Sequence, residues 1–358
     1  AHPHDLKRPY RGMPAGGGGS GWGCVGGGAE VSGVIFTGLA SLDRVSTSGY
    51  AAAFQNFIPP WNHRTWVFPP SLRAIYGEMA AASVLATGVP GFFRPRAALT
   101  FAPFLPHPAL GAYDSAPLRD TLLRLVDFDY LNTEGPRLSI GAVDIETANF
   151  VYFDNRAQEI HPEHIMASGA LPPGFAPVEI DGRFYWDGGL VSNTPLQFVM
   201  DNLGTDPVRI FQVDLFSARG HMPDNIAEVG QREKDIRYSS RTRLTTDRYH
   251  QLHDLRAAAL RLAAKLPENL RADPDLMALQ SIGPACPITL VELIHRKQSF
   301  EGGAKDYEFS RSSVNLHWAE GAQDVKHSLS HKSWKARVPG KDGLQLFDLG
   351  LPPKDSRR

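Results

Sequence analysis

HPEHIMASGALPPGFAPVEIDGRFYWDGGLVSNTPL, from His161 to Leu196, is the stretch that decides the fold of this chain. It predicts a short helix over 162–168, a strand pair that turns at Asp181-Gly182, and a strand end at Asp187-Gly188-Gly189. The two final glycines would let the backbone take positive φ values and approach a partner closely, so that the Asp187 carboxylate is aimed at it. An ordinary hairpin turn, with Asp187 as its hydrogen-bonding residue, explains the same pattern equally well.

Length and composition are those of a globular protein. The chain has 358 residues, 42% of them hydrophobic and 21% charged, and its 34 glycines and 28 prolines imply many turns. This length suits one large domain with an appendage, or two domains. The net charge of −1 gives no electrostatic argument for binding nucleic acid. Cys24 and Cys286 are too few for a disulfide framework and suit a reducing compartment.

Membrane and export signals are weak in the sequence. No apolar run reaches the ~18 residues that a membrane-spanning helix needs. The first residues, AHPHDLKRPYRG, lack the apolar core of a secretory signal. The sequence therefore favours a cytoplasmic location, either free or peripheral to a membrane.

Apolar strands alternate with amphipathic helices along the chain. We expect buried strands at 138–145, 207–215 and 288–294 and a helix at 71–85. Strands buried on both faces and separated by helices indicate an α/β layer fold with a mainly parallel sheet. Asp144, near the end of the first strand, is expected to face solvent, the commoner position for an acid on a strand.

The segment ASGALPPGFAPVEIDGRFYWDGGLVSNTPL resembles the second catalytic block of bacterial patatin-like phospholipases. RLSIGAVDIETANFVYFDN and KDIRYSSRTRLTTDRYHQL, among others, resemble the subgroup that has an additional C-terminal region. The resemblance implies a three-layer α/β/α fold with a mainly parallel central sheet and a helical C-terminal extension. It divides the chain into a Gly-rich segment (1–24), a hydrolase domain (25–216) and a family-specific region (217–358).

The resemblance also assigns site residues. The acid of the family's Asp-Gly-Gly motif, here Asp187 with Gly188 and Gly189, serves a serine nucleophile in a Ser-Asp dyad. The family's Gly-Gly-Gly-Ala motif, whose amides form the oxyanion hole, matches Gly26, Gly27 and Gly28 followed by Ala29. Composition alone makes this Gly-rich stretch equally a flexible linker.

The nucleophile motif Gly-x-Ser-x-Gly is incomplete. Ser46-Thr47-Ser48-Gly49-Tyr50 stands in the matching place before an alanine-rich helix, which makes Ser48 the candidate. Ser46 and Tyr50 replace the glycines that a strained strand-to-helix turn requires. A helix N-cap explains Ser48 as well as a nucleophile does.

The activity that the resemblance implies is hydrolysis of lipid carboxylic esters through an acyl-enzyme, without a cofactor. Two alternatives stay open: a non-catalytic lipid-binding protein on the same fold, and an intracellular polyester or oligoester hydrolase. The partner is a lipid or small ester substrate, and the oligomeric state cannot be inferred.

Two further patterns each allow a structural and a functional interpretation. Residues 237–265 predict a basic amphipathic helix, which suits either a solvated face packed on the hydrolase domain or an anionic membrane surface. The pairs His161/His164 and His250/His253 have zinc-binding spacing, but neither has a third ligand at usable spacing, so no metal site is predicted. Residues 307–329 predict one or two helices that break near Gly321.

Overall fold

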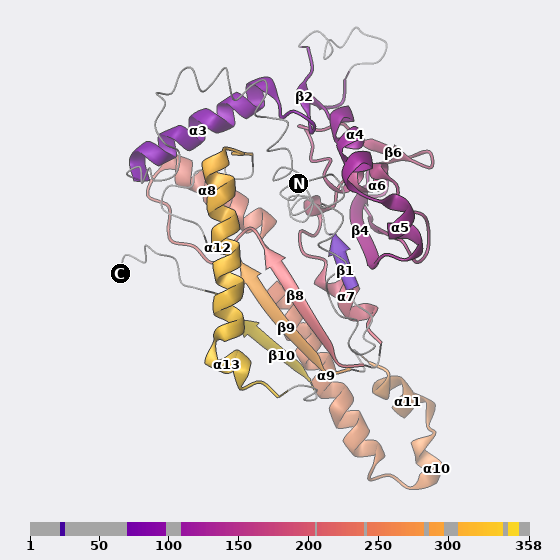
Figure 1. Cartoon of the computed structure of the whole chain (residues 1–358). Helices are drawn as coiled ribbons and strands as arrows, with labels where there is room; N and C mark the ends of the chain where they lie inside the picture. Colours follow the sequence, from indigo (N-terminus) through magenta and orange to yellow (C-terminus); the bar gives the residue numbers. More distant parts are fainter. Residues whose placement is uncertain are drawn as a thin grey trace.

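The computed structural model describes residues 22–25, 70–97, 109–204, 206–239, 242–282, 286–296, 307–338 and 343–350 (Figure 1). The described strands form one mixed sheet, one parallel sheet and a two-stranded ribbon of β2 (Arg94–Pro95) and β3 (Tyr113–Asp114). The α/β fold class predicted from the sequence is confirmed.

Strand β4 (Arg137–Asp144) is the centre of the mixed sheet, and it is buried from Ser139 to its end. It pairs with β1 (Trp22–Val25) in parallel and with β5 (Phe150–Asp154) and β7 (Arg183–Asp187) in antiparallel orientation. β6 (Val178–Ile180) completes the predicted hairpin with β7. Its turn is confirmed, because Asp181 and Gly182 have φ values of 51° and 76°, as a two-residue hairpin turn requires.

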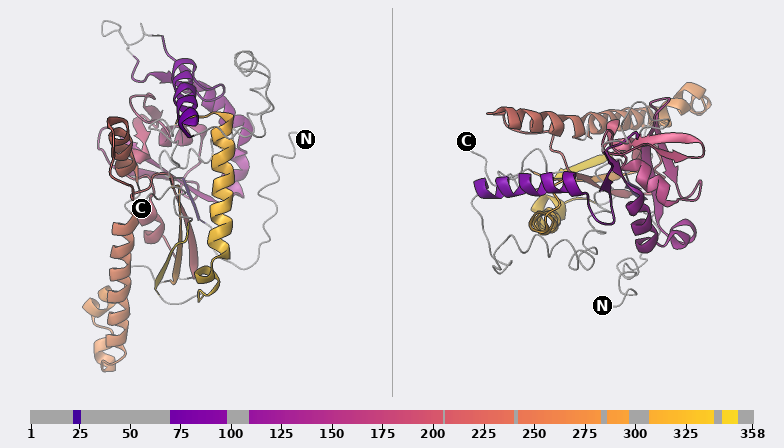
Figure 2. Two further views of the ribbon diagram at one scale, coloured as in Figure 1. Left: turned by 90° about the vertical axis from the view of Figure 1, so that its left-hand side faces the viewer. Right: turned by 90° about the horizontal axis from the view of Figure 1, so that it is seen from above.

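The second sheet is entirely parallel and has the order β10–β9–β8. Its strands are β8 (Val208–Asp214), β9 (Ile288–Ile294) and β10 (Leu344–Asp348). Figure 2 shows this sheet between two long helices, α9 (Thr242–Ala263) on one face and α12 (Arg311–Ser330) on the other. The expected three-layer arrangement with parallel strands is therefore seen in this part of the molecule, whereas the sheet around β4 is mixed.

Helices cover the mixed sheet and surround the parallel one (Figure 1). A core cluster that includes Ile140, Ile160 and Tyr185 lies between β4, β7 and α6. A second cluster, which includes Ile288 and Leu290, joins β9 to α7 and α9. The remaining helices are α3 (Pro70–Thr87), α4 (Ala116–Leu125), α5 (Phe128–Thr133), α6 (Pro162–Ser168), α7 (Leu196–Asp201), α8 (Ile226–Tyr238), α10 (Glu268–Arg271), α11 (Pro274–Gln280) and α13 (Lys332–Lys335).

Two local predictions were wrong. Helix α12 runs unbroken through Gly321, because a glycine inside a helix costs only about 1 kcal/mol and does not end it. Asp144 is buried, with 2% of its surface exposed. Its Oδ1 accepts hydrogen bonds from the backbone of Glu146 and Thr147 at 3.1 and 3.0 Å, and Arg183 reaches Oδ2 at 3.0 Å. These partners compensate for the loss of water.

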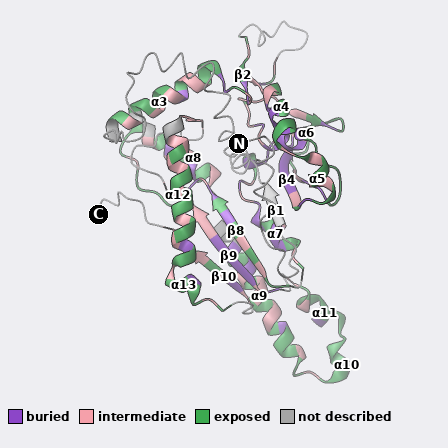
Figure 3. Ribbon diagram, viewed as in Figure 1, coloured by how far each residue is buried: buried purple, intermediate pink, exposed green. Residues whose placement is uncertain are grey.

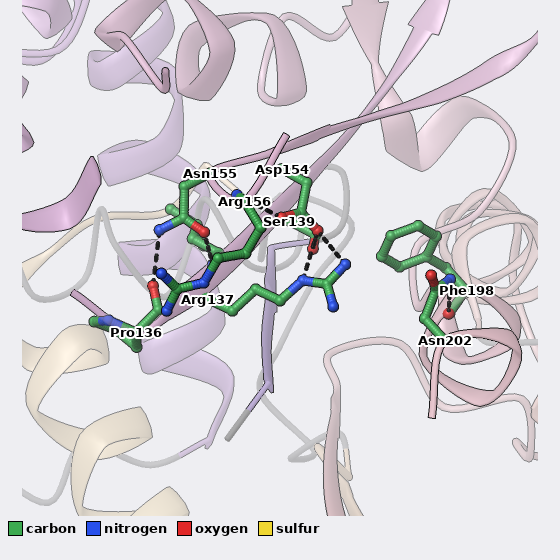
Figure 4. Close-up of polar contacts among 9 residues, drawn as sticks. Pro136, Arg137, Ser139, Asp154, Asn155, Arg156, Phe198 and Asn202 are labelled. Atoms are coloured by element: carbon green, nitrogen blue, oxygen red, sulfur yellow. Dashed lines mark hydrogen bonds and ion pairs between the residues drawn. The ribbon is translucent and has the colours of Figure 1, made fainter. Parts of the chain in front are cut away.

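A polar network fastens β5 to β4 at the opposite end from the β4–β5 turn (Figure 4). Asp154 accepts hydrogen bonds from Arg137 at 2.8 Å and from Ser139 at 2.7 Å through Oδ2, and from the Arg156 backbone at 2.8 Å through Oδ1. Burial raises the pKa of Asp154, but these donors outweigh it and hold the pKa below its usual value. The carboxylate is thus charged and fully bonded inside the sheet.

We expect Asp154→Ala to lower the free energy of unfolding by about 2 to 4 kcal/mol. The change leaves the guanidinium of Arg137 and the buried Ser139 hydroxyl without their acceptor. Urea denaturation followed by circular dichroism measures the change. Asp120→Ala, which removes an exposed carboxylate from α4, is the control and should stay within about 0.5 kcal/mol. Equal stability of the two variants would contradict a role for the network.

Candidate active site

Asp187 is the last residue of β7 and lies beside Ala142 of β4. Residues 142 and 143 of β4 pair with β7 on one side and with β5 on the other. Residues 139 and 140 likewise pair with both β5 and β1. A strand has only two edges, so β1 and β7 occupy the same edge of β4, one after the other.

The two strands meet end to end on that edge. β1 runs parallel to β4 and ends with Val25 beside Ile140, whereas β7 runs antiparallel and ends with Asp187 beside Ala142. One residue of β4, Gly141, separates the two positions, which corresponds to roughly 7 Å along a strand. The residue that follows Val25 in the chain is Gly26. The register therefore brings Val25, the residue that precedes Gly26 in the chain, near Asp187.

Asp187 is almost completely buried, with 2% of its surface exposed. Its Oδ1 accepts a hydrogen bond from the backbone N–H of Gly189 at 2.7 Å. Removal from water disfavours the charged form and raises the pKa of Asp187 to about 7, although the Gly189 N–H acts in the opposite direction. A carboxyl group that titrates near neutral pH can both take up and release a proton.

The backbone conformation of Gly188 and Gly189 differs from the expected one. They form a 3-10 helix, Gly188–Leu190, which directly follows β7, so the segment is not a hairpin turn. Residues of a 3-10 helix have negative φ, and the glycines with positive φ lie elsewhere, at Gly88, Gly91, Gly182 and Gly343. The expected positive φ at these two glycines was therefore wrong. The tight helical turn instead directs the Gly189 N–H at the carboxylate.

Main-chain and loop contacts fix the position of Asp187. Its backbone N–H donates to the carbonyl of Ala170 at 3.1 Å, just beyond α6. Asn193, which is buried, donates from its side chain to the carbonyl of Tyr238 at 3.0 Å, at the end of α8. Neither contact was inferred from the sequence. Ala170 acts through its main chain and leaves no side-chain signal, whereas Asn193 lies within the 161–196 stretch but its residue type alone does not indicate its partner.

Other predicted site residues have different outcomes. Ser48, Gly26, Gly27 and Gly28 lie outside the described residues. His164 is buried and caps α6 together with His161, its Nδ1 accepting the backbone N–H of His161 at 2.9 Å. The described part of the chain contains no group of three or more His, Cys, Asp or Glu residues that could hold a metal ion. Over the same residues, no helix is long and apolar enough to cross a bilayer.

Comparison with known proteins gives two family matches. Residues 36–200 match the patatin-like phospholipase family, and residues 236–341 match a second family described as patatin phospholipase. No curated protein matches the chain significantly. The first match contains Asp187, Gly188 and Gly189, and it supports lipid acyl hydrolysis as the general activity. From its sequence and from these two matches, the chain belongs to the patatin-like phospholipase family.

Proposed function

We propose that this protein hydrolyses carboxylic esters of lipids through a Ser-Asp dyad and an acyl-enzyme intermediate. Asp187 is the base, Ser48 the nucleophile, and the amides of Gly26, Gly27 and Gly28 form the oxyanion hole. The observation that carries the proposal is the buried carboxyl of Asp187, with a pKa of about 7, at the point where β1 and β7 meet.

The reaction follows from these assignments. The Asp187 carboxylate takes the proton of the Ser48 hydroxyl while the oxygen attacks the ester carbonyl carbon. The negative charge that develops on the carbonyl oxygen is stabilised by backbone N–H donors, each typically worth about 3 kcal/mol. The tetrahedral intermediate then collapses, the C–O bond to the alcohol breaks, and Asp187 returns its proton to the leaving alcohol.

Deacylation repeats the sequence with water. Asp187 takes a proton from the attacking water and gives it to the Ser48 oxygen as the acyl bond breaks, which releases a fatty acid and restores the Ser48 hydroxyl. One residue acts alternately as base and acid, and such a residue works best when its pKa is close to the working pH. The pKa of Asp187 suits both steps at neutral pH without a histidine.

The first prediction concerns Asp187 as the base. Asp187→Asn keeps the shape of the side chain but cannot accept the serine proton, so kcat for a p-nitrophenyl ester should fall at least about 100-fold. Asp181→Asn is the matched control. It makes the same chemical change in the preceding turn, where asparagine also tolerates a φ of 51°. Asp181→Asn should keep the activity of the unmodified chain, and similar losses in both variants would contradict the assignment.

The second prediction concerns the nucleophile. A fluorophosphonate probe should label the protein, and peptide mapping by mass spectrometry should find the adduct on Ser48. Ser48→Ala should abolish labelling, and Asp187→Asn should slow it strongly because the serine is no longer deprotonated. Labelling at another serine, or labelling that survives Ser48→Ala, would overturn the choice of Ser48. A protein that binds lipid vesicles but resists the probe would favour the non-catalytic alternative.

The third prediction is the pH profile of hydrolysis. The base form of Asp187 must be present, so kcat/KM for a soluble ester should rise with pH and level off above about pH 7. A stopped assay over pH 5 to 9 measures the profile. A plateau that already begins near pH 4 to 5 would show that an ordinary exposed carboxylate, or none, is the base.

A series of acyl chain lengths and a polyester substrate, measured at the plateau, separates lipid esters from polyesters.

The fourth prediction concerns stability. The folded-state pKa of Asp187 is above the unfolded value, so the folded state binds the proton more tightly between about pH 4 and 7. The stability that this proton contributes is present at low pH and is lost as pH rises through about 7. Asp187→Asn cannot ionise, so its melting temperature should exceed that of the unmodified chain at pH 8 and approach it at pH 4.5. If the melting temperatures of the two proteins differ by the same amount at pH 8 and at pH 4.5, burial of the Asp187 charge is not the cause of the difference.

A further inference from the structure

Helix α9 begins on the body of the protein and ends outside it. Near its start, the Tyr249 hydroxyl donates to the carboxylate of Asp201 on α7, and Leu252 packs against the second core cluster. The C-terminal part of α9 extends away from both sheets, and α10 and α11 return beside it (Figures 1 and 2). We call residues 255–282 the projecting hairpin. Of the two interpretations that the sequence allows for 237–265, packing on the rest of the protein applies to the first part of α9.

The projecting hairpin is a formed unit. Ala259 of α9 and Leu276 of α11 are buried, with 5% and 6% of their surfaces exposed, and the two helices are in contact. Asp273 caps α11 by accepting the backbone N–H groups of Asp275 and Leu276 at 2.9 and 3.3 Å. The hairpin therefore holds a defined surface at a distance from the body.

Much of the ribbon of the projecting hairpin has the colour of exposed residues (Figure 3), and large apolar side chains are among them. Leu255 and Leu262 lie on one face of α9, since they are seven residues apart. Leu270 lies on α10, and Met277 lies on α11. Each of these four side chains has between 44% and 56% of its surface exposed. An exposed group of apolar residues held away from the body is typical of a docking surface.

The charges beside these residues identify the partner. Residues 255–267 contain three basic residues, Arg256, Arg261 and Lys265, and no acidic residue. Arg261 and Lys265 are exposed, and neither takes part in an ion pair within the described part of the chain. The acidic residues of the hairpin come later, and one of them, Asp273, is used to cap α11. Exposed apolar side chains next to Arg261 and Lys265 fit the boundary between acyl chains and anionic headgroups.

We propose that the projecting hairpin docks the protein on an anionic lipid surface. The choice of a lipid surface rests on the proposed function, in which the substrate is a lipid ester. A second copy of the chain fits less well, because a stable dimer interface uses about 20 to 30 residues from each side. One side of residues 255–282 provides fewer, and its basic residues would face those of the other copy.

The test is flotation with vesicles of phosphatidylcholine alone and of phosphatidylcholine with 30% phosphatidylserine. The unmodified chain should bind the anionic vesicles, and high salt should weaken binding. Leu262→Glu/Met277→Glu should reduce bound protein at least about tenfold, because two apolar anchors are lost. Arg261→Gln/Lys265→Gln should remove the preference for phosphatidylserine. Met222→Glu/Ile226→Glu, which alters two side chains that are each 85% exposed on the body, is the matched control and should bind normally.

Three results would overturn the proposal. The first is that the unmodified chain does not bind the vesicles. The second is that the hairpin and control variants lose vesicle binding equally. The third is that sedimentation shows a concentration-dependent dimer, which Leu262→Glu/Met277→Glu abolishes although this variant still binds vesicles. Hydrolysis of a short soluble ester is measured in parallel. It should be unchanged in the hairpin variant, since the hairpin extends away from β4, the strand beside which Asp187 lies (Figure 1). If neither the unmodified chain nor any variant hydrolyses the soluble ester, the result counts against the proposed catalysis. The flotation result would still decide whether the hairpin binds lipid.

Discussion

The pairing of β4 along both edges is the constraint on which the candidate active site depends. β5 fills one edge, so β1 and β7 must share the other, and they run toward each other along it. β1 already occupies this edge as far as Ile140, so β7 cannot shift two residues toward β1 without a clash between Asp187 and Val25, and the opposite shift would widen the gap. The register of one hairpin therefore sets the distance between the acid and the end of β1.

The same arrangement explains why the acid has an unusual proton affinity. The 3-10 helix after β7 gives Asp187 one N–H donor, whereas Asp144 and Asp154 each have several donors and an arginine. All three carboxyl groups are buried, but the pKa falls for the two acids with charged partners and rises for Asp187. Burial alone does not mark an active-site acid. What distinguishes Asp187 is burial with few compensating donors, which costs stability at neutral pH.

Sequence reasoning succeeded where local chemistry determines the structure. The turn at Asp181-Gly182, the buried strand β4 and the family of the chain followed from residue patterns that need no distant partner. It failed where contacts that are not evident from the local sequence determine the burial or the backbone conformation of a residue. Two donors to Asp144 lie in the turn that directly follows it, but its charged partner, Arg183, comes from β7, and the sequence does not show that β7 pairs beside it. The φ values of Gly188 and Gly189 depend on a helical turn that glycine permits but does not require. Ser48 and the three oxyanion glycines remain predictions.

The region after residue 216 is more than an appendage to the part that carries Asp187. β8 comes before that residue and β9 after it, and the two pair along the full length of both strands. α8, also after it, receives the hydrogen bond from Asn193, six residues beyond the acid. The proposed division between 25–216 and 217–358 thus describes sequence organisation, while the packing crosses it. Because β9 is the buried centre of its sheet, removing the second region would leave β8 without its partner strand and the loop after Asp187 without its contact at Tyr238. The second region therefore supports the loop that follows the acid, while β7 and its pairing with β4 position the acid itself.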